Sequence, residues 1–281
     1  MKKINLIVTL AALLCAFVSC DKIEGPYITP DDSVDTNVEF PDIDPNNVFR
    51  KVLIEEYTGH RCTNCPDGHR ELASLHERYG DTLVAIGIHA GSFAQTTSSF
   101  PTDFTTDEGN TLYENFTINQ IGTPAAVVNR MKHGNAYPLS IPAWQPAIAE
   151  ELTHDCVAAV QIINLFDASS KKLTAHTRTT LLNGYSGEVQ LALYVIEDGI
   201  VAPQKDGETT IEDYVHNHVL RGSLNGVYGT LLTTAEEDGS YLKSYELDCS
   251  SKSWNFSNCT VVAILMDADT HEVLQVEQTK F

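Results

Sequence analysis

Residues 52–79 read VLIEEYTGHRCTNCPDGHRELASLHERY, and this stretch decides the fold that the sequence predicts. It opens with an apolar run typical of a buried strand and breaks at Gly59. Cys62 and Cys65 follow, just before a segment with Leu72 and Leu75 at helical spacing. The pattern predicts a strand, a tight turn, a Cys-x-x-Cys pair and a helix, in that order.

The spacing of the two cysteines suits thiol–disulfide chemistry. A thiol at the first residue of a helix faces unpaired backbone N–H groups and the positive end of the helix dipole, and both lower its pKa. We expect Cys62 at that position, exposed, as the attacking thiolate. Cys65 comes three residues later on the same helix face, where it can bond to Cys62 or resolve a mixed disulfide with a partner.

Residues 48–152 resemble the thioredoxin fold, and the Cys-x-x-Cys segment resembles its active-site unit. The resemblance implies that Glu56, six residues before the first cysteine, is a buried carboxylate that assists proton transfer to the second cysteine. It also implies a cis-proline at Pro124, within residues 121–128, with Thr123 and Pro124 contacting the substrate. The expected fold of this part is therefore an α/β thioredoxin-like domain.

Two departures from that family are visible beside the cysteines. Arg61 stands where tryptophan is usual, and Thr63-Asn64 replaces the common Gly-Pro pair. They bear on the expected redox potential more than on the fold. The whole chain, with EEYTG at 55–59 and YVHNHVLR at 214–221, is similar to the twenty-eight-kilodalton outer-membrane lipoprotein family.

The cysteine motif has two alternative interpretations. His60 and His69 flank the pair, and four potential zinc ligands within ten residues are compatible with a zinc knuckle. An apolar strand before the motif and a long helix after it disfavour zinc, and we expect no metal and no cofactor. A purely structural disulfide is the other alternative, in which case Glu56 would cap a helix or meet a cation. One of the two adjacent acids, Glu55 or Glu56, is expected to face solvent.

His216 and His218 lie two residues apart, which places them on one side of a strand if the segment is a strand. No acidic residue or cysteine at a fixed spacing completes a metal site with them. Histidines hydrogen-bonded within a loop are the favoured interpretation.

Composition points to a globular protein. The chain has 281 residues, 42% of them hydrophobic and 20% charged, which is enough for two ordinary domains. The formal net charge of −20 opposes binding to phosphate backbones, so we expect no nucleic-acid partner.

The amino terminus predicts export and a lipid anchor. Residues 1–20 combine two lysines, an apolar run and a terminal Cys20, as in a lipoprotein signal peptide. Residues 17–20 resemble a lipobox, which would make Cys20 the acylated first residue of the mature protein; an ordinary secretory peptide is the alternative. Residues 21–47 are acidic and proline-containing, and they predict an extended tether. Either signal leads to an oxidising compartment.

Residues 154–281 change from helical to alternating periodicity. Six strand-like segments without intervening helices predict an all-β, immunoglobulin-like sandwich domain after a thioredoxin-like domain at 48–153. The six segments are 157–166, 173–182, 188–196, 241–249, 260–266 and 272–278. Cys249 ends one predicted strand and Cys259 precedes the next, so we expect a structural disulfide between them, with Cys156 as the odd thiol.

Two functions fit these features. The first is a membrane-anchored thiol–disulfide oxidoreductase of the bacterial cell envelope, with Cys62, Cys65, Glu56 and Pro124 acting on protein thiols or disulfides and a redox partner. The second is an outer-membrane lipoprotein adhesin or assembly protein that uses the same fold as a scaffold. We favour the first because a scaffold does not need these four residues together. The outer membrane is the expected location.

Overall fold

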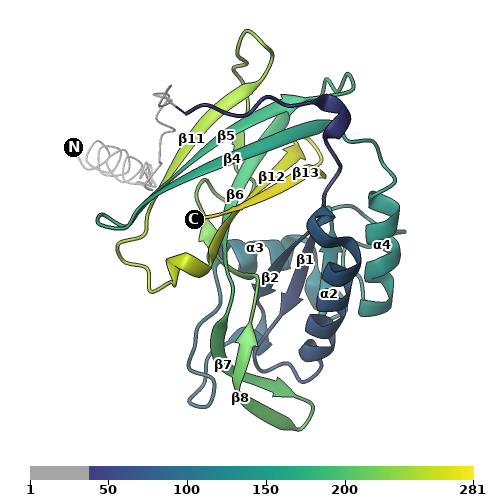
Figure 1. The fold of residues 1–281 in the computed structure, drawn as a ribbon. Coiled ribbons are helices and arrows are strands. Elements are labelled where there is room, and N and C mark those ends of the chain that lie inside the picture. The colour runs from purple at the N-terminus through teal and green to yellow at the C-terminus, as the bar shows by residue number, and fades with distance from the viewer. Residues whose placement is uncertain (1–37) are drawn as a thin grey trace, which may run out of the picture. The chain divides into compact units, whose positions relative to one another are not determined.

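The computed structural model describes residues 38–281 (Figure 1). The predicted signal peptide, the predicted lipidation residue Cys20 and the first part of the predicted tether lie outside the described residues. In the described part, no helix has the length and apolar character needed to cross a membrane.

A mixed α/β part is followed by a region rich in strands. The α-helices are α2 (Cys65–Tyr79), α3 (Asp107–Asn115) and α4 (Trp144–Glu151). Short 3-10 turns cover Pro45–Asn47, Gly80–Thr82, Ser92–Ala94, Ile118–Gln120, Ile141–Ala143 and Phe256–Asn258. The strands are β1 (Val52–Thr58), β2 (Leu83–His89), β3 (Ala125–Val128), β4 (Ala158–Asp167), β5 (Lys172–Leu181), β6 (Val189–Glu197), β7 (Ile200–Asp206), β8 (Thr209–His216), β9 (Val219–Ser223), β10 (Thr230–Leu231), β11 (Tyr241–Asp248), β12 (Cys259–Asp267) and β13 (Val273–Lys280).

Strand β1 is buried along its whole length, and its side chains alternate between two layers. Ile54 packs under helices α2 and α4, whereas Leu53 and Tyr57 pack on the side of helix α3. By the same alternation, Glu56 faces helix α2 and Glu55 faces the opposite layer. The strand therefore places one carboxyl group beneath the cysteine motif and the other in the second layer.

The predicted strand–helix–strand unit is present. Strand β1 pairs with β2 in parallel and with β3 antiparallel. Between β1 and α2 the chain turns at Gly59, where an added Cβ would lie 2.6 Å from the backbone of Phe93. Only glycine allows this close approach of the motif to the loop after β2.

One sheet runs through both halves of the chain, in the order β13-β12-β6-β9-β2-β1-β3, with β10 beside β6. All six strands predicted for residues 154–281 are present within one or two residues. Strands β6, β12 and β13 extend the sheet that contains β1 and β2, and β9 joins the two groups. The predicted boundary between residues 153 and 154 therefore does not interrupt the sheet, because β9 pairs with β2 on one side and β6 on the other.

Strands β4, β5 and β11 form a separate sheet, drawn in Figure 1 as a layer over β6 and β12. Apolar side chains fill the space between these two layers, including Val160, Ala175, Leu191 and Val261. The strands β7 and β8 pair only with each other in the described sheets and form a hairpin. The sequence did not predict this hairpin or β9.

Candidate functional site

The two cysteines of the motif are joined by a disulfide. Their Cα atoms lie 5.4 Å apart, and Cys65 is the first residue of helix α2. Cys62 lies in the turn before the helix, so the prediction that the helix begins at Cys62 is wrong by one turn. Pro66 follows directly in the first turn of the helix, where its fixed φ and missing N–H are tolerated.

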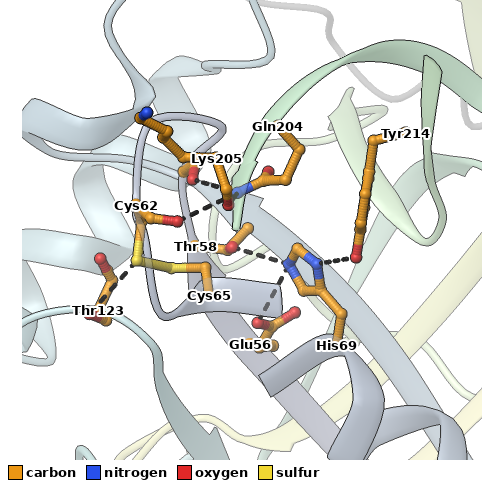
Figure 2. Close-up of a disulfide and its surroundings, with 10 residues drawn as sticks. Glu56, Thr58, Cys62, Cys65, His69, Thr123, Gln204, Lys205 and Tyr214 are labelled. Carbon is orange, nitrogen blue, oxygen red and sulfur yellow. Dashed lines mark hydrogen bonds and ion pairs between the residues drawn. A yellow bond between two sulfur atoms is a disulfide. The ribbon is translucent and has the colours of Figure 1, made fainter. Parts of the chain in front are cut away.

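The prediction that Cys62 is exposed is also wrong, because the residue is 2% exposed in this structure. The hairpin β7–β8 lies against the turn that holds Cys62, and hydrogen bonds join the two. Gln204 donates from Nε2 to the carbonyl oxygen of Cys62 at 3.2 Å. The backbone N–H of Lys205 donates to His60 at 2.8 Å, and that of Gly207 donates to Thr63 at 2.9 Å. Figure 2 shows Gln204 and Lys205 beside the motif.

Pro124, for which a cis peptide bond was predicted, lies next to the disulfide. The peptide bond between Thr123 and Pro124 is cis. The Cys62 sulfur lies 3.5 Å from the carbonyl oxygen of Thr123 (Figure 2). In the disulfide this sulfur carries no hydrogen, whereas the reduced thiol can donate to that carbonyl. The loop before β3 thus contacts the first cysteine of the motif.

Glu56 lies beneath helix α2, 2% exposed. An added Cβ on Gly68 would lie 2.9 Å from Oε1 of Glu56, so the glycine lets the helix approach the carboxyl group. This oxygen has no hydrogen-bond partner among the described residues. Burial raises the pKa of Glu56 from 4.5 to about 8, and the carboxyl group is therefore mainly protonated at neutral pH.

Both adjacent acids of β1 are buried, which corrects the expectation that one of them faces solvent. Glu55 is fully buried and forms an ion pair with Arg130, with Nη2 and Oε1 2.6 Å apart. The alternating strand has a packed layer on each side, so neither carboxyl group reaches water. A cation compensates one carboxylate, and a proton neutralises the other.

His69 connects Glu56 to the second half of the chain (Figure 2). Its Nε2 lies 3.5 Å from Oε1 of Glu56 and 2.9 Å from the hydroxyl of Thr58. Its Nδ1 lies 2.7 Å from the hydroxyl of Tyr214 on strand β8. Burial lowers the pKa of His69 to about 3, so the ring is neutral and its contact with Glu56 is not an ion pair at neutral pH.

The other histidines of the sequence motifs have separate contacts. His60 lies 3.1 Å from the carbonyl oxygen of Gln95. His216 ends β8 and lies 3.3 Å from the carbonyl oxygen of Ala202. His218 is in the turn after β8 and lies 3.3 Å from Asp198. Residues 38–281 contain no cluster of three or more acidic, histidine or cysteine side chains arranged to hold a metal.

The predicted disulfide between Cys249 and Cys259 is absent, and both are free, buried thiols. Each sulfur points to a carbonyl of its own segment: Cys249 contacts Leu247 at 3.8 Å, and Cys259 contacts Asn255 at 3.4 Å. Burial raises the pKa of Cys259 to about 12. Cys156 is also free and half-buried.

Sequence reasoning missed Tyr214 and Gln204 and considered His69 only as a metal ligand. A signal for His69 was present, because it follows Cys65 by four residues and so shares its helix face. No local pattern indicates Tyr214 or Gln204, since the residues they contact lie 145 and 142 positions away along the chain.

The fold and this site define a mixed α/β protein with a buried Cys-x-x-Cys disulfide between a cis-proline loop and a buried carboxyl group. The chain belongs to the Omp28 outer membrane protein family, whose model matches residues 109–281. This membership supports an association with the outer membrane of the cell envelope. The matched segment contains Tyr214 and Gln204 but not Cys62 or Cys65.

Two solved structures are similar in fold, and a third matches a smaller part of the chain. HBP35 of Porphyromonas gingivalis is similar with a TM-score of 0.64 and 17% identity, covering 83% of this chain and 76% of that chain. Protein AGR_C_4864 from Agrobacterium tumefaciens has a TM-score of 0.50 and 11% identity, covering 83% and 95%. A domain of the outer membrane lipoprotein Omp28 from Porphyromonas gingivalis is 22% identical over 46% of this chain and 90% of that chain, with a TM-score of 0.32. No curated protein matches.

Proposed function

We propose that the protein is a thioredoxin-like thiol–disulfide oxidoreductase of the cell envelope, held at the outer membrane by a lipid on Cys20. The observation that carries the proposal is the buried carboxyl group of Glu56 on the face of β1 beneath helix α2, whose Oε1 has no hydrogen-bond partner among the described residues. Such a group costs stability, and groups of this kind cluster at functional sites. In this proposal it exchanges a proton with Cys65.

The site supports the following exchange with a protein dithiol. A substrate thiolate attacks the Cys62 sulfur, forming a mixed disulfide and breaking the Cys62–Cys65 bond, whose electron pair stays on Cys65. Cys65 takes the proton held by Glu56. The second substrate thiolate then attacks the substrate sulfur of the mixed disulfide and releases Cys62 as a thiolate. The substrate is oxidised by two electrons and the protein disulfide is reduced by two; in the reverse direction the protein reduces a substrate disulfide.

The Thr123–Pro124 loop supplies the binding role in this proposal. Its carbonyl next to the Cys62 sulfur is an acceptor for the reduced thiol, and its backbone is available to an extended substrate segment. The strands of the C-terminal region supply the hairpin that shields the disulfide. We infer that partner proteins reach Cys62 from the side of Thr123.

The burial of Cys62 favours a second candidate, an outer-membrane adhesin or assembly protein with a structural disulfide. Family membership also fits this candidate, because the matched segment excludes both cysteines. In that case Cys62–Cys65 closes the turn before α2 and exchanges with nothing. The immunoglobulin-like assignment of residues 154–281, supported here by the layer of β4, β5 and β11 on β6 and β12, would then describe the binding part.

Trapping of mixed disulfides distinguishes the oxidoreductase from the adhesin or assembly protein with a structural disulfide. We expect Cys65→Ser to accumulate mixed disulfides between Cys62 and envelope proteins, because the resolving thiol is missing, and Cys62→Ser to accumulate none. Glu56→Gln should slow resolution more than the initial attack, since only Cys65 depends on the carboxyl group. Equal alkylation rates of Cys62 and Cys65 after reduction, with no partner trapped by either variant, would establish the scaffold.

A further inference from the structure

Helix α2 carries a histidine on the face that holds Cys65. Cys65, Gly68 and His69 are spaced three and four residues apart, so all three lie over the same side of β1. Gly68 admits the Glu56 carboxyl group, and His69 follows immediately, with Nε2 3.5 Å from that carboxyl oxygen. The cysteine, the buried carboxyl group and the imidazole therefore form one row.

The row continues to the surface through strand β8. Nδ1 of His69 lies 2.7 Å from the Tyr214 hydroxyl, and Tyr214 is only half-buried. Figure 2 shows the imidazole between Glu56 and Tyr214. Glu56, His69 and Tyr214 line one pocket with a volume of about 220 Å³, together with His216 and His218. A pocket of this size holds several water molecules, at about 30 Å³ each.

Glu56 reaches the same pocket, and its Oε1 has no hydrogen-bond partner among the described residues. A proton that arrives from Cys65 must leave before the next cycle. The contact of Oε1 with Nε2 of His69 at 3.5 Å offers it a path toward Tyr214.

We propose that His69 and Tyr214 carry the proton between Glu56 and solvent, a relay that rests on the oxidoreductase function proposed above. When the reduced protein resolves a mixed disulfide, Cys65 gives its proton to the Glu56 carboxylate and its sulfur attacks Cys62. Glu56 passes a proton to Nε2 of His69, Nδ1 gives its own to Tyr214, and the Tyr214 hydroxyl releases one to water. One proton enters at Cys65 and one leaves at Tyr214, and no electron moves along the row.

The contacts of the His69 imidazole suit a coupled transfer of two protons, one to the ring and one from it. In the tautomer with the hydrogen on Nδ1, the ring donates to Tyr214 and its Nε2 accepts from Thr58, with Oε1 of Glu56 3.5 Å away. Burial lowers the pKa of His69 to about 3, so the ring does not hold both protons for long. Gaining one proton at Nε2 while losing one at Nδ1 keeps it neutral throughout. His69 and Tyr214 therefore act on the thiol chemistry indirectly, through Glu56, and we class them as positioning residues and not as catalytic residues.

The test uses a chromogenic aromatic disulfide on the reduced, full-length protein. The first chromophore is released when Cys62 is modified, and the second when Cys65 attacks that mixed disulfide. The second phase is independent of reagent concentration, which separates it from the reaction of Cys156. We expect Tyr214→Phe and His69→Ala each to slow the second phase about tenfold or more and leave the first phase unchanged.

Two controls separate a relay from a structural effect. Tyr245→Phe removes another buried tyrosine hydroxyl, bonded to Thr230 at 2.8 Å, and should leave both phases unchanged. Added imidazole should restore the second phase of His69→Ala, whose missing ring enlarges the pocket. If His69→Ala fails to fold, Tyr214→Phe decides, because it removes a single oxygen atom.

The outcomes are distinguishable. A wild-type second phase that Tyr214→Phe and His69→Ala both leave intact would overturn the relay and leave the oxidoreductase standing. A wild-type protein that shows no second phase would overturn the oxidoreductase function and the relay with it. Slowing of the first phase to the same extent as the second would show that the substitutions act on access to Cys62 and would also overturn the relay.

Discussion

The burial of the two adjacent acidic residues of β1, Glu55 and Glu56, is compensated in two different ways. Glu55 forms an ion pair with Arg130, which reaches it with bonds from Nε and Nη2 between 2.6 and 3.2 Å. Glu56 has no cation against it and is neutralised by a proton, with its pKa raised to about 8 by burial. A buried ion pair is part of the packed core, whereas a carboxyl group with a pKa close to neutral pH can gain and lose a proton.

Glu56→Gln should therefore stabilise the protein at pH 7 but not at pH 4.5. The folded state raises the pKa of Glu56 from 4.5 to about 8, so unfolding releases a proton between these values. Stability from the neutral carboxyl group is complete below pH 4.5 and is lost as the pH rises toward 8. At about 1.4 kcal/mol per pKa unit, the loss by pH 7 is at most about 3 kcal/mol. Urea unfolding of the wild type and of Glu56→Gln at both pH values measures this difference in stability.

The neighbouring residue provides the control for this prediction. Glu55→Gln should destabilise the protein at pH 7, because it leaves Arg130 buried without its carboxylate. Equal stability of wild type and Glu56→Gln at both pH values would show that the Glu56 carboxyl group is not held in its protonated form.

At the scale of single residues, the sequence predicted the place in the fold of residues that belong to a local motif. Glu56 on β1, Cys65 on α2 and the cis-proline Pro124 before β3 lie where the motif predicts, whereas Cys62 lies one turn before the helix and is buried. Tyr214 was not predictable, because its contact with the motif depends on how a hairpin far along the chain folds back.

The hairpin β7–β8 shows why some elements escape prediction from periodicity. Most side chains of β8 are exposed or half-buried, and Val201 and Val215 are exposed although they are apolar. A strand with few buried apolar side chains gives little alternating signal, so its position follows from pairing and hydrogen bonds instead. By contrast, β6 and β12 are buried almost throughout, and their apolar runs were recognised.

Gln204→Ala should open the hairpin locally and expose Cys62. The Gln204 side chain is fully buried and donates to the Cys62 and Gly59 carbonyl oxygens at 3.2 and 3.4 Å. Its removal leaves these acceptors unsatisfied, at a cost of about 1–3 kcal/mol. We expect alkylation of Cys62 in the reduced protein to become several-fold faster, measured by mass spectrometry of the tryptic peptide.

A matched substitution checks that the effect is local. Gln161→Ala removes a glutamine on β4 that donates to Pro41 at 2.8 Å, away from the hairpin, and should not change the alkylation rate. A Gln204→Ala protein that loses stability without faster alkylation would mean that other contacts shield Cys62.

On the scale of the whole molecule, the two halves of the chain are tied together by one sheet and by buried charge. The parallel pairing of β2 with β9 is limited to Gly87 and Val219. Arg130 adds a stronger connection, because it pairs with Glu55 of β1 and donates to Tyr194 of β6 at 3.2 Å. Sequence reasoning predicted the strands on each side but not this junction, since no local pattern tells which distant strands become neighbours in a sheet.

Arg130→Met should destabilise the whole described fold by about 3–5 kcal/mol, the usual cost of leaving one member of a buried ion pair uncompensated. The guanidinium group is fully buried and lies 2.6 Å from Glu55, so water cannot replace it. Combining Arg130→Met with Glu55→Gln removes both charges and should recover most of the loss. Chemical unfolding followed by tryptophan fluorescence reports both halves, through Trp144 of α4 and Trp254 before β12. Because one sheet joins them, we expect a single transition that shifts as a unit, and two separate transitions would show that the halves unfold independently.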